Sequence, residues 1–336
     1  MSGFLPYVQS VAKGTLATAA GVSTLAVALV YYGQNYLIYP SAFPQESRTM
    51  VYTPDQFGME YQSLELKTSD EVVLRCYLMT QKENSGFRWE DIDSSKRPRT
   101  EDEYVSSRPT VVMFHGNAGN LGFRIPLAAQ FYRRMGCNVL MMSYRGYGLS
   151  EGSPSEKGLQ IDAQTALDYL TTHPAFSKTP IILYGQSIGG AVAIDLASKN
   201  PDKIAAIIVE NTFTSLPDLV PHVMPVFSRV SFLCHQKWNS ASKISSIPAT
   251  TPILMLSGAR DEIVPKEHMR SLWEAVAKRG EKKTGNGSEY KVGLERAKFV
   301  EFPHGRHNDT CEEPGYWAAI SEFVASIPSN IASKSS

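Results

Sequence analysis

Two hydrophobic patterns alternate along most of this chain. Short, nearly continuous apolar segments are followed by longer segments in which apolar residues recur every three or four positions, the patterns of buried strands and amphipathic helices. Predicted strands are Thr110–Phe114, Cys137–Ser143, Pro180–Tyr184, Ile204–Val209, Thr251–Ser257 and Lys298–Phe302. Predicted helices are Arg124–Met135, Glu156–Thr172, Ser187–Lys199, Lys266–Arg279 and Pro314–Ile327. This alternation indicates an α/β fold with a mostly parallel sheet and helices on both faces.

The sequence also predicts a hairpin at the edge of the sheet and two charged insertions. Tyr61–Lys67 and Val72–Met79 alternate between apolar and polar residues around a polar turn, which predicts an antiparallel hairpin at the edge of the sheet. Residues 81–108 are dominated by charged residues and serine without periodicity, and residues 278–294 form a smaller segment of the same kind. Both are predicted to be solvated loops inserted between regular elements.

The N-terminal part has a different pattern. No charged residue occurs between Gly14 and Gln45, and residues 14–32 are apolar enough, with tyrosines following, to predict a single transmembrane helix. A cleavable signal peptide and an amphipathic or buried helix are the alternatives. The predicted domains are an anchor, 1–45, and a folded domain, 46–330. Lys13 before the span favours a cytoplasmic N-terminus, hence a type II protein of the endoplasmic reticulum or another endomembrane.

Composition excludes some classes of function. Lys+Arg 33 balances Asp+Glu 33, so the chain lacks the basic excess expected of a nucleic-acid-binding protein. The four cysteines are scattered without metal-ligand spacing, and 336 residues suffice for a core without a disulfide framework. No metal or organic cofactor is predicted.

The segment Gly185-Gln-Ser-Ile-Gly189 is the main candidate for chemistry. It lies between a predicted strand and a predicted helix, which is the context of a nucleophile elbow. Glycines on either side of Ser187 leave room for a sharp, strained turn. Ser187 is therefore the predicted nucleophile.

A serine nucleophile needs a base, and the base needs an acid that orients it. Asp261 and His307 each follow a predicted strand, in the chain order Ser, Asp, His that this architecture uses. The weighed alternatives are His304 as the base and Glu210 or Asp309 as the acid. The preferred catalytic residues are Ser187, Asp261 and His307.

The oxyanion of an acyl-transfer intermediate needs two donors. One is predicted to be the backbone N–H of Ile188, directly after the nucleophile. The other is expected from the loop after the first parallel strand, with Asn117 preferred and Ala118 next. His115 is expected to hold that loop, and Arg145 to pin neighbouring loops rather than to bind substrate.

Residues 216–250 are rich in Pro, Val, Phe, Leu and Met and follow a predicted strand, at the place where a lid would emerge. They are expected to form short helices that make an apolar wall for an acyl chain. Simple packing on the core is the alternative, left open here.

Together these motifs resemble a known family. His115-Gly-Asn-Ala-Gly-Asn, Tyr144-Arg-Gly-Tyr-Gly, Gly185-Gln-Ser-Ile-Gly-Gly, Glu210-Asn-Thr-Phe-Thr-Ser and His307-Asn-Asp resemble the α/β-hydrolase superfamily. More narrowly, the chain is similar to the membrane-anchored fungal bud-emergence family and its animal abhydrolase-domain relatives. The resemblance implies an α/β-hydrolase fold, the same triad, and hydrolysis of acyl esters or thioesters. The predicted partners are an acyl ester, thioester or lipid-like substrate and, from the predicted anchor, a membrane. A membrane-tethered scaffold that uses a hydrolase fold in polarity signalling is the alternative function.

Overall fold

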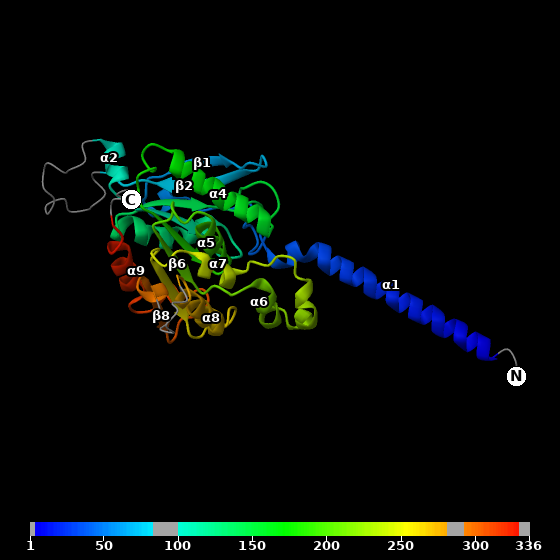
Figure 1. The fold of residues 1–336 in the computed structure, drawn as a ribbon. Coiled ribbons are helices and arrows are strands. Elements are labelled where there is room, and N and C mark those ends of the chain that lie inside the picture. Colours follow the sequence, from blue (N-terminus) through cyan, green and yellow to red (C-terminus); the bar gives the residue numbers. More distant parts are fainter. Residues whose placement is uncertain (1–3, 83–99, 281–291, 329–336) are drawn as a thin grey trace, which may run out of the picture.

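The computed structural model describes residues 4–82, 100–280 and 292–328 (Figure 1). Its centre is a sheet of eight strands in the order β1-β2-β4-β3-β5-β6-β7-β8. The first two pairings, β1 with β2 and β2 with β4, are antiparallel, and all others are parallel. The strands are β1 Gln62–Lys67, β2 Val73–Met79, β3 Thr110–Phe114, β4 Asn138–Met142, β5 Ile181–Gln186, β6 Ala206–Glu210, β7 Ile253–Gly258 and β8 Ala297–Phe302. The mostly parallel sheet with a hairpin edge confirms the predicted fold class.

The helices that follow these strands are α3 Ile125–Ala129, α4 Glu156–Thr172, α5 Ile188–Lys199, α6 Leu216–Val223, α7 Ser240–Ser246, α8 Lys266–Ala277 and α9 Tyr316–Ala325. A 3₁₀ segment, η5 Pro225–Leu233, follows α6. The helix expected over Arg124–Met135 is only partly α-helical: a 3₁₀ turn, Leu121–Arg124, precedes α3, and a π-helical turn, Gln130–Arg134, follows it.

The core forms on both faces of the sheet. Successive side chains of a strand point to opposite faces, so Val112 and Phe114 of β3 belong to one buried cluster and Val111 and Met113 to the other. The first cluster packs against α4, α5, α7 and α8, and the second against α3 and α9. Because both faces are covered, the central strands are buried along their whole length, which explains their continuous apolar sequences.

The N-terminal segment forms one long helix, α1 Phe4–Ile38, which extends away from the body of the protein (Figure 1). In the ranges that the structure describes, no helix is both long and apolar enough to cross a membrane. The transmembrane span predicted over residues 14–32 is therefore not supported. Gly21, Ser23 and Thr24 fall among its aliphatic residues and lower its mean hydropathy. The orientation and the localisation that were predicted from this span are not confirmed.

The charged insertion is less irregular than expected. Residues 83–99 lie outside the described residues, but the end of the segment forms helix α2, Glu101–Ser106. The Thr100 side chain caps this helix by accepting from the N–H of Glu103, and Tyr104 and Val105 are buried beneath it. The prediction of a loop over 81–108 is thus wrong at its C-terminal end. In the second insertion, residues 281–291 also lie outside the described residues.

Arg145 pins neighbouring loops together, as expected. Its guanidinium donates to Asp70 in the β1–β2 turn at 2.7 and 2.9 Å and to Asp162 of α4 at 2.8 Å. The Asp162 side chain is fully buried, so Arg145 provides the charge that a carboxylate in that position requires.

Candidate active site

Ser187 lies on the sharp turn that its motif predicts, between β5 and α5. Its backbone has φ 55° and ψ −121°, a conformation that L-residues rarely adopt. The turn leaves no space on either side. A Cβ atom at Gly185 would lie 2.1 Å from the carbonyl oxygen of Gly189, and one at Gly189 would lie 2.1 Å from that of Phe114. Only glycine is compatible with these contacts, which explains the spacing of the motif.

His307 and Asp261 meet at the same edge of the sheet. His307 Nδ1 lies 2.8 Å from Asp261 Oδ2, and both side chains are almost completely buried. The other carboxylate oxygen accepts from the N–H groups of Ile263 and Val264 at 2.9 and 2.7 Å. With Nδ1 engaged by the carboxylate, Nε2 is the free basic nitrogen of His307. No hydrogen bond joins it to the Ser187 hydroxyl among the described residues, although both residues line one cavity.

The alternative residues lie elsewhere or have other partners. His304 is exposed and is absent from the lining of that cavity. Asp309 accepts from the N–H of Arg306 at 2.6 Å, which makes it a turn cap. Glu210 is fully buried and accepts from the hydroxyl groups of Tyr184 and Tyr316. Burial raises the pKa of Glu210.

Three polar residues that the sequence analysis did not assign to the site hold the His307 loop. The Gln186 amide donates to the carbonyl of His307 at 2.9 Å, and Asn211 donates to the same carbonyl at 3.3 Å. Glu262 accepts from the N–H of His307 at 3.3 Å. Gln186 is the last residue of β5, and Asn211 directly follows β6. Their position at the ends of central strands is the feature of the sequence that could have identified them.

The expected oxyanion donors also face this cavity. Ile188 and Asn117 both line it, and neither backbone N–H donates to any other described residue. The Asn117 side chain is committed elsewhere: its amide donates to the carbonyl of Ile38, and its oxygen accepts from the Tyr147 hydroxyl at 2.6 Å. The backbone of Asn117 is therefore the group that remains available to a substrate oxygen.

His115 contributes to the shape of this loop. Its Nδ1 lies 2.8 Å from the carbonyl oxygen of Gly116, and its ring packs against that of Tyr144 with centroids 4.3 Å apart. Burial lowers the pKa of His115 to about 4, so the imidazole is neutral at pH 7. A neutral, buried imidazole bonded to its own loop fits the structural role expected for it.

The cavity around Ser187 has a volume of about 380 Å³ and is mostly apolar. Helix α6 supplies one wall with Leu216, Leu219, Val220 and Val223. A smaller cavity of about 50 Å³ adjoins it between α1 and η5, and Val220 and Met224 line both. Phe227 lines only the smaller cavity.

The end of α1 and the residues directly after it supply a second wall, which the sequence did not predict. Leu37, Ile38, Pro40 and Phe43 line the main cavity, although they fall within the segment predicted as a separate anchor. Residues 115–120, which include the expected donor Asn117 and are called the oxyanion loop below, are bonded to the same part of the chain. The N–H of Gly119 donates to the carbonyl of Phe43 at 2.8 Å.

Helix α1 is also bonded to the segment after η5. The Gln34 side chain donates to the carbonyl of Leu233 at 3.3 Å and accepts from the N–H of His235 at 2.8 Å. Tyr39 then donates to Gln236 and accepts from the Trp238 indole. Removal of the first 45 residues would therefore open the cavity as well as remove a helix.

An eight-stranded sheet of this topology, with a serine on a strained turn after β5, defines an α/β hydrolase. A family model described as alpha/beta hydrolase fold matches residues 109–231. Esterase Pf2001 of Pyrococcus furiosus shares the fold with a TM-score of 0.62 at 18% identity, over 83% of this chain and 96% of its own.

Relatives of greater similarity narrow the assignment. Protein bem46 of Schizosaccharomyces pombe is 46% identical over 312 residues, which cover 91% of this chain and 92% of the relative. A protein of Saccharomyces cerevisiae named uncharacterized membrane protein YNL320W is 39% identical over 314 residues, 94% of this chain and 96% of its own. The chain therefore belongs to the bem46 family of α/β hydrolases, and the resemblance inferred from its motifs is confirmed.

Proposed function

We propose that this protein is a serine hydrolase that cleaves acyl esters or thioesters at Ser187. The observation that carries the proposal is the convergence, at one apolar cavity, of a serine on a strained turn and a histidine bonded to a buried carboxylate. The three residues come from loops after β5, β7 and β8, at the carboxyl edge of the sheet, where active sites of open α/β sheets are found.

The proposed chemistry needs only groups of this chain and water. The Ser187 hydroxyl attacks the acyl carbonyl while Nε2 of His307 accepts its proton, and Asp261 stabilises the resulting imidazolium. The N–H groups of Ile188 and Asn117 donate to the oxyanion, and each such donor contributes about 3 kcal/mol in comparable sites. His307 then protonates the leaving group, and a water molecule hydrolyses the acyl-enzyme by the reverse sequence.

The shape of the cavity suggests which part of the substrate it holds. Apolar side chains of α1 and α6 surround Ser187, so an acyl chain is the natural occupant, and the adjoining cavity beside η5 would hold its distal end. This supports the acyl-wall hypothesis for residues 216–250. Whether the leaving group is an alcohol or a thiol is to be decided by comparing matched esters and thioesters.

A fluorophosphonate probe tests the proposal directly. The probe should label the wild type and should not label Ser187→Ala. Ser198→Ala is the control: it removes a hydroxyl group from α5 at a distance from the cavity, and this variant should be labelled like the wild type. Labelling of Ser187→Ala would remove this serine from the reaction. A cellular phenotype that follows deletion but not the Ser187→Ala replacement would favour the scaffold function instead.

A further inference from the structure

One charged side chain of the main cavity has no role in the chemistry described so far. Arg124 is the only lysine, arginine, aspartate or glutamate among the described residues that line it. It ends the 3₁₀ turn that follows the oxyanion loop and is partly buried. In an apolar cavity its charge is screened less by water than it would be at the surface, which strengthens its attraction for an anion.

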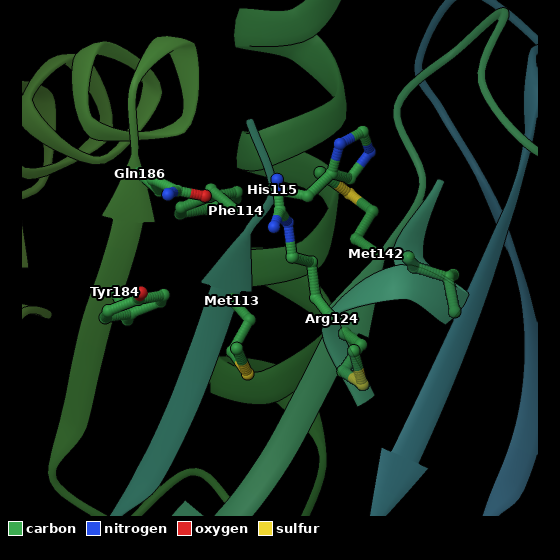
Figure 2. Close-up of a pocket in the computed structure, with 9 residues that line it drawn as sticks. Met113, Phe114, His115, Arg124, Met142, Tyr184 and Gln186 are labelled. Carbon is green, nitrogen blue, oxygen red and sulfur yellow. The ribbon is translucent and has the colours of Figure 1, made fainter. Parts of the chain in front are cut away.

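The guanidinium of Arg124 lies over the oxyanion loop. A Cβ atom at Gly116 would lie 3.3 Å from Nη2 of Arg124 and 3.5 Å from Oε1 of Gln186. Figure 2 shows the side chain of Arg124 extending towards His115 and Gln186. The positive charge is thus placed beside the residue that precedes the Asn117 amide, close to where a scissile carbonyl would bind.

Within the part of the chain that the structure describes, no carboxylate forms an ion pair with this guanidinium. The side chain of Arg124 also forms no hydrogen bond with any residue that the structure describes. The charge of Arg124 opposes the rise in the pKa of Glu210 that burial causes, but the Glu210 carboxyl is hydrogen-bonded to tyrosine hydroxyl groups and the Asp261 carboxyl to His307. Partly buried arginines are usually paired, so the missing counterion points to a ligand.

Deepening the proposed function, on which this inference rests, we propose that Arg124 binds a carboxylate or phosphate group of the substrate. The preferred substrates are then acyl esters or thioesters that carry an anionic group near the scissile bond. A guanidinium is suited to this task because its planar array of N–H donors matches two oxygens of either anion. The apolar walls exclude other charges, so Arg124 would also orient the substrate.

A competing explanation involves neighbours of Arg124. Gln186 Oε1 and His115 Nε2 are buried acceptors that have no hydrogen-bond partner among the described residues. Both belong to residues that line a third cavity, of about 10 Å³, which Arg124 also lines (Figure 2). If Arg124 only served to satisfy these acceptors, its loss would weaken the fold and the hydrolysis of every substrate alike. The two explanations therefore differ in their dependence on substrate charge.

A kinetic experiment uses two matched pairs of esters. 4-Nitrophenyl hemisuccinate and its methyl ester differ in charge on the acyl side, and 4-acetoxybenzoate and its methyl ester differ on the leaving-group side. In at least one pair the wild type should favour the anion in kcat/KM. Arg124→Gln should reduce this preference by about 10- to 100-fold, the range of a charge-assisted hydrogen bond.

Two variants serve as controls. Arg124→Lys keeps the charge and should retain part of the preference, which also covers the case in which Arg124→Gln is unstable. Arg134→Gln changes an exposed arginine on the turn after α3 and should leave the preference unchanged. The proposal is overturned if the wild type shows no preference in either pair, or if Arg124→Gln lowers both members of a pair equally.

A binding experiment separates this inference from the proposed function. In Ser187→Ala protein, decanoate and decyl phosphate should raise the melting temperature more than decanol does, and addition of Arg124→Gln should abolish the difference. A larger response to one of the two anions identifies the group that is bound. Equal shifts with decanol and the anions would refute the role of Arg124, even if hydrolysis is never detected.

Discussion

The two adjoining cavities predict how the preference for acyl-chain length depends on the lid-like segment, residues 216–250. Met224 lines both cavities, whereas Phe227 lines only the outer one, beside α1 and η5. Truncation of Met224 should therefore affect every acyl chain that passes the junction. Truncation of Phe227 should affect only acyl chains that are long enough to reach the smaller cavity.

The magnitude follows from the contacts that are lost. Met224→Ala removes the equivalent of two to three methylene groups, at about 0.8 kcal/mol each, or roughly 2 kcal/mol. That corresponds to about a 30-fold loss of kcat/KM for long-chain esters. Phe227→Ala should cost about tenfold for long chains, because its ring borders only the smaller cavity, and should leave short chains nearly unaffected.

The assay compares 4-nitrophenyl butyrate with 4-nitrophenyl decanoate. Phe232→Ala is the matched control, because Phe232 lies in the same segment, is 69% exposed and lines neither cavity. Its profile should equal that of the wild type. If Met224→Ala and Phe227→Ala weaken both esters equally, the segment serves packing alone and the reasoning fails.

Three further predictions concern the residues around the site. Asp261→Asn should lower kcat by several orders of magnitude at unchanged melting temperature, because the amide cannot stabilise an imidazolium at His307; a loss below tenfold would exclude Asp261 as the acid. Arg145→Met should lower the free energy of unfolding in urea by about 3–5 kcal/mol, since Asp162 would stay buried without a cation, and a loss below 1 kcal/mol would contradict this. Burial lowers the pKa of His115 from 6.5 to about 4. Between these two pH values the imidazole is protonated in the unfolded chain but neutral in the folded protein, so the free energy of unfolding should fall by about 3 kcal/mol as the pH drops through this range. Urea unfolding at pH 7 and pH 4.5 should show a smaller loss in His115→Gln than in the wild type, and an unchanged loss would refute the assignment.

Much of the fold could be read from periodicity because a strand buried on both faces needs a continuous apolar segment. The strands from β3 to β8 lie within one or two residues of their predicted bounds. The nucleophile elbow could also be recognised from the sequence, because the close contacts at Gly185 and Gly189 allow no side chain at either position. Helix α2 was missed because its burial depends on Tyr104 and Val105 alone, two apolar residues within a charged segment.

The order of the motifs along the chain predicted Ser187, Asp261 and His307 as the catalytic residues. The distances between these side chains, however, depend on how the loops after three different strands come together. Sequence position favoured Asp261 as the acid but left Glu210 as an alternative, because Glu210 also lies at the end of a predicted strand. In the folded protein Glu210 accepts from tyrosine hydroxyl groups, whereas Asp261 contacts the imidazole of His307.

The sequence by itself therefore determined the local elements, the edge of the sheet at which polar groups gather, and the residue that occupies the elbow. Only the tertiary structure showed that Ile38 and Phe43 line the cavity and bond to the oxyanion loop, and that Arg124 lies there without an ion pair to any residue in the described ranges. The reason is physical. Local patterns report which face of an element is buried, whereas a binding site depends on which distant segments pack together, and that is decided by the folded chain as a whole.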